Sequence, residues 1–113
     1  LVYGNNSILF TGDLGVKMEK EYIRIYQSFL KSDLLKAGHH GSNTSSSFEF
    51  LNQVKPKYGL ISAGLGNKFK HPNKVVLERM NKLGIKIYRT DLSGAILLNC
   101  DGLKLSSIDW RNY

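Results

Sequence analysis

The chain has 113 residues, a length that predicts one small domain. Its 42% hydrophobic and 22% charged residues are ordinary for a globular protein and exclude disorder of the whole chain. The formal net charge of +7 favours an anionic partner, although the lysines are spread along the chain and a basic domain without such a partner is the alternative. The single cysteine, Cys100, excludes an internal disulfide and a cysteine-rich zinc site.

The first predicted elements in chain order are a hairpin, a helix and a strand. Two short apolar runs flank Asn5 and Asn6, residues that tolerate the backbone of a tight turn, and this predicts a β-hairpin. Apolar residues at helical spacing then predict a helix over 16–30, and a short apolar run predicts a strand over 33–38. The helical series are Met18, Tyr22, Ile25 and Phe29, and Tyr22, Tyr26 and Leu30.

A second helix is predicted over 45–54, because Ser46 and Glu49 have the spacing of a capping box and Phe50, Leu51 and Val54 follow. This helix is expected to end before Pro56, and the apolar run 58–64 then predicts a buried strand.

A third helix is predicted with Pro72 at its first position and Gly84 just past its end. Its apolar face carries Val76, Met80 and Leu83. Strands are predicted over 85–90, 94–99 and 103–108. Strands and helices therefore alternate in the middle of the chain, which predicts a layered α/β domain.

Four of the predicted strands end in a glycine-containing loop with an aspartate or histidine just beyond it. Ligands of open α/β sheets bind outside the carboxyl ends of the strands. We therefore expect these side chains, which include all three histidines of the chain, to approach one edge of the sheet. They are Asp13, His39, His40, His71 and Asp91.

Imidazole and carboxylate are ligands for zinc, manganese or iron, and a carboxylate can bridge two ions that share an activated water. Simpler roles are open for each residue: Asp13 as a turn or cap residue, the paired histidines as solvated loop residues, His71 as a helix cap and Asp91 as a turn residue. The set is also incomplete, because a catalytic zinc needs at least three protein ligands and the chain has no His-x-His pair.

Taken together, the segments "ILFTGDLG", "LKAGHHGS", "SSSFEFLNQVKPKYGLISAG", "NKFKHP" and "YRTDLSGAI" resemble one known family. The resemblance, from about Ser7 to Leu98, is to the C-terminal half of the metallo-β-lactamase-type domain of ComEC-type DNA-internalisation competence proteins. It implies an α/β fold that is about half of a four-layer αβ/βα metallo-β-lactamase sandwich, with a mixed sheet and helices packed on it. Residues 1–113 would then be the C-terminal portion of a hydrolase domain, without the N-terminal half that carries the His-x-His-x-Asp-His metal motif.

The resemblance also implies roles for single residues. Asp13 matches the carboxylate that bridges the metal ions, and His39 matches a metal-binding histidine. His40 would lie beside the metal or face the substrate, and which of the two adjacent histidines is the ligand stays open. His71 matches a histidine that lines the active site, with Lys70 where the family more often has glycine. The implied catalytic set is Asp13, His39, His40 and His71, of which Asp13 and His39 would bind metal.

Further residues are implied around this set. Ser42 and Asn67 would be loop residues near the site, and Asp91 would orient a metal-binding histidine. Lys68 and Lys70, which flank the loop before His71, would contact the DNA backbone; a solvated loop is the alternative for both.

The implied activity is hydrolysis of DNA phosphodiesters during uptake in competence, with two divalent ions, zinc or manganese, in the complete domain. The fragment alone is expected to be inactive. The alternatives are a non-catalytic, basic nucleic-acid-binding or scaffold module that retains the fold, and a related metallo-hydrolase that acts on another phosphodiester.

The resemblance further implies DNA, the remainder of the domain and the membrane-channel portion of a longer protein as partners. A second copy of the chain, bound through an uncovered face of the sheet, is a further expected partner. The expected location is the bacterial cell membrane, as a soluble domain of a multi-pass protein.

Overall fold

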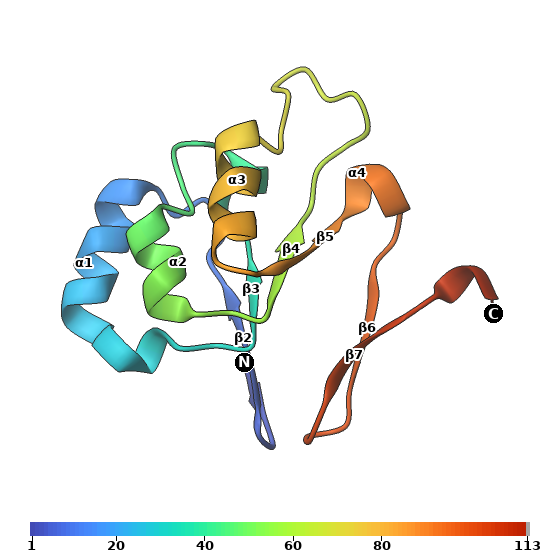
Figure 1. Cartoon of the computed structure of the whole chain (residues 1–113), viewed down its shortest axis with the longest axis horizontal. Coiled ribbons are helices and arrows are strands. Elements are labelled where there is room, and N and C mark those ends of the chain that lie inside the picture. Colours follow the sequence, from blue (N-terminus) through green and yellow to red (C-terminus); the bar gives the residue numbers. More distant parts are fainter. Residues whose placement is uncertain (113) are drawn as a thin grey trace.

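The computed structural model describes residues 1–112 and shows a five-stranded sheet with helices against one face (Figure 1). The strand order is β1-β2-β3-β4-β5, in which β1 is antiparallel to β2 and the remaining neighbours are parallel. The sheet is therefore mixed, and the predicted α/β class is confirmed. The strands are β1 (Val2–Tyr3), β2 (Asn6–Phe10), β3 (Leu34–Lys36), β4 (Tyr58–Ile61) and β5 (Lys86–Arg89).

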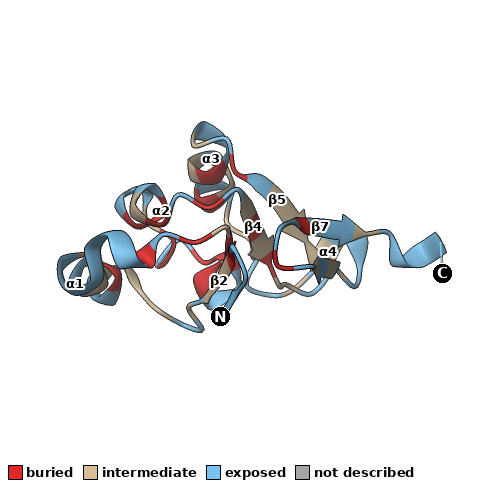
Figure 2. Ribbon diagram, turned by 90° about the horizontal axis from the view of Figure 1, so that it is seen from below, coloured by how far each residue is buried: buried red, intermediate tan, exposed pale blue. Residues whose placement is uncertain are grey.

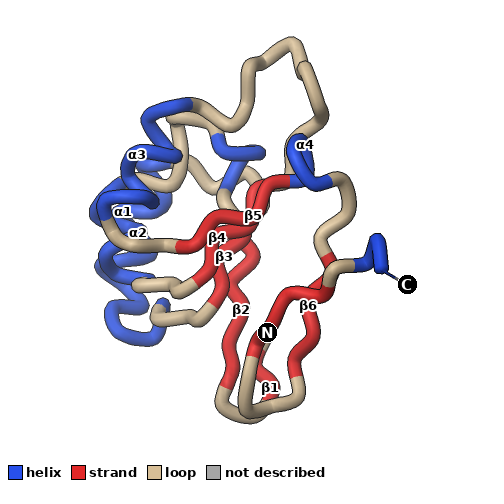
Figure 3. Tube along the Cα trace, turned by 45° about the vertical axis from the view of Figure 1, so that its right-hand side comes forward, coloured by secondary structure: helices blue, strands red, loops and turns tan. Residues whose placement is uncertain are grey.

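Three helices connect the parallel strands, and all three lie on the same face of the sheet (Figures 1 and 3). Each connection moves one strand along the sheet in the same direction. Because strand–helix–strand crossovers are right-handed, this stepwise order places every helix on one side. The helices are α1 (Val16–Tyr26), α2 (Phe48–Val54) and α3 (Lys74–Lys82), with short 3-10 turns at Gln27–Leu30 and Gly38–Gly41.

The chain continues after β5 into a separate hairpin on the side of the sheet away from the helices (Figure 3). A short helix, α4 (Thr90–Ser93), leads into the antiparallel strands β6 (Leu97–Cys100) and β7 (Leu105–Ile108). A final 3-10 turn covers Trp110–Asn112. The hairpin turn meets the β1–β2 turn, where the amide of Asn5 donates to the carbonyl of Gly102 at 2.7 Å.

The main core lies between the helices and the sheet, where buried apolar residues line the inner sides of α2 and α3 (Figure 2) and partly buried residues of α1 pack against them. Gly59 of β4 leaves room for α3, since a Cβ atom there would lie 3.0 Å from the sulfur of Met80. The predicted apolar residues of α2 are confirmed as buried core residues, as are Val76 and Met80 of α3, whereas Leu83 just after α3 is partly buried against them. The fully buried members are Leu35, Ala37, Leu51, Val54, Ile61, Val76 and Met80, with Phe50 at 1% exposure.

The structure corrects the predicted face of the first helix. The helix ends at Tyr26, and four residues of the two predicted apolar series are exposed, namely Met18, Ile25, Tyr26 and Phe29. Tyr22 and Ile23 pack against the core instead, and beside them lies Glu19, which is 1% exposed. The helical spacing was right, but the face that meets the sheet is centred on a different set of positions.

Two helix starts also differ from the prediction by one or two residues. Ser47, rather than Ser46, caps α2, because its side-chain oxygen accepts from the amide of Phe50 at 3.2 Å. Asn73 caps α3 through the amide of Val75, so Pro72 lies just before the helix instead of at its first position. Among residues 1–112, no helix has the length and apolar character that crossing a bilayer requires.

Candidate functional site

The carboxyl ends of the parallel strands lie at one edge of the sheet, and the loops that leave them are joined by hydrogen bonds. The hydroxyl of Thr11, after β2, donates to the carbonyl of Lys36 in β3 at 3.0 Å. The amide of His39 donates to the carbonyl of Gly12 at 2.8 Å. The loop that carries Asp13 therefore lies directly beside the loop that carries the two adjacent histidines.

The same pattern continues across the other half of the edge. A ring nitrogen of His40, Nδ1, lies 2.8 Å from the carbonyl oxygen of Ser62, in the loop after β4. The hydroxyl of Thr90, after β5, accepts from the amide of Ala63 and donates to its carbonyl, both at 2.8 Å. The predicted convergence of four strand ends at one edge is thus confirmed.

The two adjacent histidines have an uncommon backbone. His39 has φ 49° and His40 has φ 56°, both in the left-handed region that residues with a side chain rarely adopt. Each such residue costs about 1–2 kcal/mol, and surrounding contacts must hold it in place. One of these contacts is the hydroxyl of Ser45, which donates to the carbonyl of Gly38 at 2.7 Å. Both histidines are exposed, so the strained turn presents two imidazoles to solvent.

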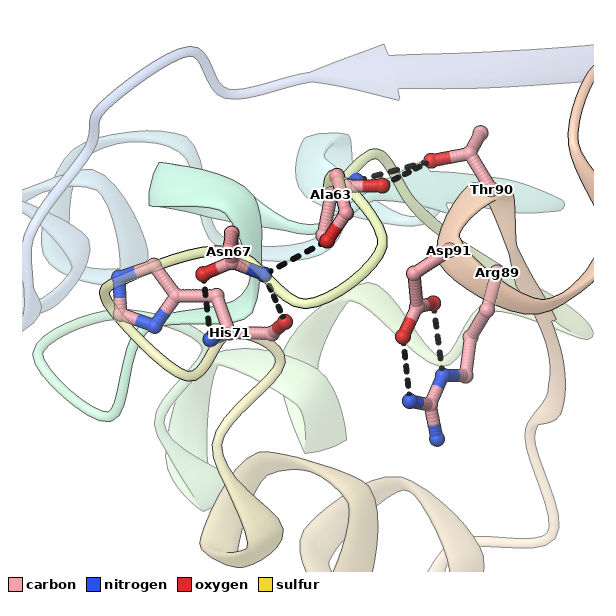
Figure 4. A network of polar contacts seen from close by, with 7 residues as sticks. Ala63, Asn67, His71, Arg89, Thr90 and Asp91 are labelled. Carbon is pink, nitrogen blue, oxygen red and sulfur yellow. Dashed lines mark hydrogen bonds and ion pairs between the residues drawn. The ribbon is translucent and has the colours of Figure 1, made fainter.

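The loop between β4 and α3 is shaped by Asn67, whose side chain closes it on itself (Figure 4). The amide group of Asn67 donates to the carbonyl of His71 at 2.7 Å, and its oxygen accepts from the amide of His71 at 3.0 Å. The side chain of Asn67 thus satisfies both backbone polar groups of His71, as a second backbone segment would. Figure 4 shows the imidazole of His71 pointing away from Asn67, outside this ring of contacts.

His71 lies beside the adjacent histidines although it is 32 positions from His39. The ring centroids of His39 and His71 are 6.3 Å apart, and the ring of Phe69 stacks on His71 at 5.8 Å with an interplanar angle of 18°. The Nδ1 atom of His71 is buried and has no hydrogen-bond partner within residues 1–112. A shallow hollow of about 240 Å³ opens here, lined by His40, Ala63, Gly64, Asn67, Phe69 and His71.

These side chains do not form a complete metal centre by themselves. Within residues 1–112, no group of three or more histidine, cysteine, aspartate or glutamate side chains is placed to hold an ion. Asp13 is exposed, and the residue before it, Gly12, accepts the hydrogen bond from the amide of His39. Imidazole and carboxylate suit zinc or manganese, but the described residues do not gather three such donors around one point.

Asp91 makes another contact than the one expected of it, and Ser42 lies in the loop of the two adjacent histidines. Both oxygens of Asp91 are used by Arg89, at 3.1 Å from Nε and 2.7 Å from a terminal nitrogen, so its partner is a guanidinium and not a histidine. The hydrogen bonds from Arg89 hold the pKa of the Asp91 carboxyl below its ordinary value. The buried Ser42 hydroxyl bonds the hydroxyl of Thr44 at 2.9 Å and folds its own loop. Lys68 and Lys70 are both exposed, as DNA contacts would require.

A buried carboxylate holds the histidine loop in place, and sequence reasoning missed it. Glu19 of α1 accepts from the backbone amides of Ser46 and Ser47, just before α2. Arg79 of α3 donates to the carbonyls of Ser45 and Ser46 at 3.4 and 3.2 Å. The only sequence signal was an acidic residue in the first turn of a helix, which is common and does not predict burial.

The chain is similar to parts of several bacterial proteins. It is 49% identical over 96 residues to Competence protein ComA of Neisseria gonorrhoeae, which covers 85% of this chain and 14% of that protein. It is 41% identical over 93 residues to ComE operon protein 3 of Bacillus subtilis, covering 82% and 12%. It is 40% identical over 96 residues to Recombination protein 2 of Haemophilus influenzae, covering 85% and 12%. The chain therefore spans about one eighth of the length of these relatives.

These names correct the family attribution made from the sequence. The relatives are named as a competence protein, a ComE operon protein and a recombination protein, and none of these names is ComEC or mentions a metallo-β-lactamase. The attribution to the ComEC type is therefore not kept. No family model matches the chain, and no solved structure matches it.

Proposed function

We propose that the chain is a DNA-binding module of a longer protein that works in competence and DNA uptake. Its relatives include Competence protein ComA, and its net charge of +7 suits a polyanion. The observation that carries the proposal is the edge of the sheet, where three histidines and the exposed Lys68 and Lys70 lie on adjoining loops. Phosphates of DNA are the ligand class that this surface would neutralise.

The proposal predicts a salt-dependent affinity for DNA that falls when the loop lysines are removed. Each lysine that contacts a phosphate releases about one counterion, so the slope of log affinity against log salt should be less steep by about 0.7–0.9 per lysine. The double variant Lys68→Ala/Lys70→Ala should therefore flatten the slope by about 1.5. Fluorescence anisotropy of labelled DNA over a salt series measures both slopes.

The matched control is Lys31→Ala/Lys82→Ala, which removes the same charge from exposed positions outside the edge loops. It should leave the slope nearly unchanged, because these lysines lie away from the carboxyl ends of the strands. Equal slopes for both double variants would mean that DNA binding depends on the total charge of the chain and not on the lysines of the edge loops. A wild-type chain that binds no DNA at low salt would contradict the proposal itself.

A second candidate function is metal-dependent hydrolysis of DNA or another phosphodiester. It is supported by the contact between the Gly12 and His39 backbones, and by the 6.3 Å separation of the His39 and His71 rings. Asp13 and His39 would be ligands to zinc or manganese, with further ligands from polypeptide outside these 113 residues. Such ions would supply Lewis-acid activation of water and charge stabilisation when bound. His40 and His71 would face the substrate from the hollow, and the lysines would hold its phosphates.

Metal content tests this second candidate. We expect the 113-residue chain to lose added zinc or manganese on desalting, and a longer protein that supplies the missing ligands to retain it. In that longer protein, Asp13→Asn should lower the retained metal by about one ion, because a neutral amide is a weaker ligand than the carboxylate it replaces. Asp109→Asn, at another exposed aspartate, is the control. Unchanged metal content in Asp13→Asn would remove Asp13 from the site.

The complete domain and its setting are also part of the proposal. A four-layer αβ/βα sandwich would cover the side of the sheet that the helices leave open, either with the remainder of the domain or with a second copy of the chain. The length of the relatives supports further domains in the parent protein. We propose a bacterial membrane protein with a channel portion as that parent, with this chain as one of its domains outside the bilayer.

A further inference from the structure

An aromatic side chain is exposed at the mouth of the candidate site without any role in the core. Phe69 is 67% exposed and lines the hollow together with His40 and His71. It lies on the loop that Asn67 closes, between two lysines, at the edge where the strand ends meet. An exposed phenyl ring adds little to the stability of the fold. We therefore infer the role of Phe69 from the groups that it contacts.

Two groups orient the Phe69 ring but do not bury it. The imidazole of His71 is nearly parallel to it at 18° and 5.8 Å, and the Nζ atom of Lys68 lies 5.0 Å from its centroid. At an exposed site, a cation–π contact favours the paired arrangement over the separated one by only about two- to fivefold. Stacking of a nucleobase on an aromatic side chain strengthens binding about five- to hundredfold. A base can therefore displace the ammonium group of Lys68 from the ring, and this group is then free to pair with a phosphate.

We propose that Phe69 is a stacking platform for an unpaired nucleobase, and that this edge of the sheet takes single-stranded DNA. The inference rests on the proposed DNA-binding function and adds the form of DNA and the residue that selects it. In a duplex, both faces of each base are occupied by its neighbours, so the ring would find no partner there. The arrangement of an aromatic ring between Lys68 and Lys70 matches the combination of stacking and charge that binds single strands.

The test compares three probes of equal length with the 113-residue chain: oligothymidylate, an oligomer of abasic deoxyribose phosphates, and a hairpin duplex. Phe69→Ala should weaken binding of oligothymidylate by about tenfold and leave binding of the abasic oligomer and the duplex unchanged. Phe69→Tyr should retain the wild-type affinity, because it keeps the ring. Fluorescence anisotropy at one fixed salt concentration gives all the affinities.

The control is Phe29→Ala, which removes another exposed phenyl ring, 86% exposed, from the 3-10 turn before β3 at the other end of the sheet. It should bind all three probes as the wild type does. An equal loss for all three probes in Phe69→Ala would show that the residue acts through loop shape, and unchanged binding of oligothymidylate would exclude stacking. Either outcome would contradict the stacking role of Phe69 without contradicting DNA binding by the chain. A wild-type chain that binds none of the probes would overturn the proposed function as well.

Discussion

Replacing Glu19 with alanine is expected to lower the free energy of unfolding by about 3 kcal/mol. The carboxylate is 1% exposed and accepts from the amides of Ser46 and Ser47. Its removal leaves these two donors near the start of α2 without their partners in a buried setting. Each unsatisfied buried donor costs about 1–3 kcal/mol, and hydrogen bonds to a charged group are the stronger kind.

Urea unfolding followed by circular dichroism measures this effect. The control is Glu21→Ala on the same helix, where the side chain is exposed and pairs with Arg24 at 2.9 Å. An exposed pair of this type contributes less than about 1 kcal/mol, so the control should stay close to the wild type. If the two variants unfold at the same urea concentration, Glu19 does not hold the segment before α2.

Replacing Gly41 with alanine is expected to cost about 3 kcal/mol as well, from two separate causes. Gly41 has φ +81°, and a Cβ atom there would lie 2.8 Å from the Cβ of Pro72 and 3.1 Å from its Cα. The amide of Asn73 also donates to the carbonyl of Gly41 at 2.9 Å. Gly41 is thus the point where the loop of the two adjacent histidines touches the loop of His71.

A second glycine separates the two causes. Gly66 has φ +62°, but a Cβ atom added there would meet nothing within 4 Å. Gly66→Ala therefore reports the backbone cost alone, about 1 kcal/mol, and the remaining loss in Gly41→Ala reports the contact with Pro72. Thermal or urea unfolding of both variants gives the comparison. Equal losses would mean that the two loops do not press on each other at Gly41.

Much of the architecture follows from local patterns. The alternation of strands and helices, the buried faces of α2 and α3, and the glycine after α3 are encoded within short windows. The convergence of the loops follows from topology, because parallel strands share one carboxyl edge. A hydrogen-bond partner such as Gly12 for His39, however, is 27 positions away and has no local signature.

The features that sequence reasoning missed depend on contacts between distant segments. Met18 and Ile25 fit an apolar helical face as well as Tyr22 does, and only the approach of α2 decides which of them are covered. Glu19 belongs to the covered side because two amides in the segment before α2 need an acceptor. The one-residue shift of the cap from Ser46 to Ser47 arises in the same place, since Glu19 accepts from both of their amides.

At the site, residue types were easier to predict than their partners. The placement of His39, His40 and His71 near one another agrees with the strand-end pattern. Asp91 also follows a strand end, but Arg89 two residues earlier donates hydrogen bonds to both of its oxygens. The exposure of Phe69 could not be predicted either, because a single phenylalanine in a loop sequence can be buried or exposed.

The anchoring of the loop between Ala63 and Pro72 has a practical consequence for protein engineering. Thr90 fixes the first residue of this loop, Gly41 packs against the last, and Asn67 braces the middle. The side chains at positions 65, 68, 69 and 70 are exposed on this anchored loop. These four positions are therefore suited to randomisation and screening for new ligand preferences, because they can be changed without altering the residues that anchor the loop.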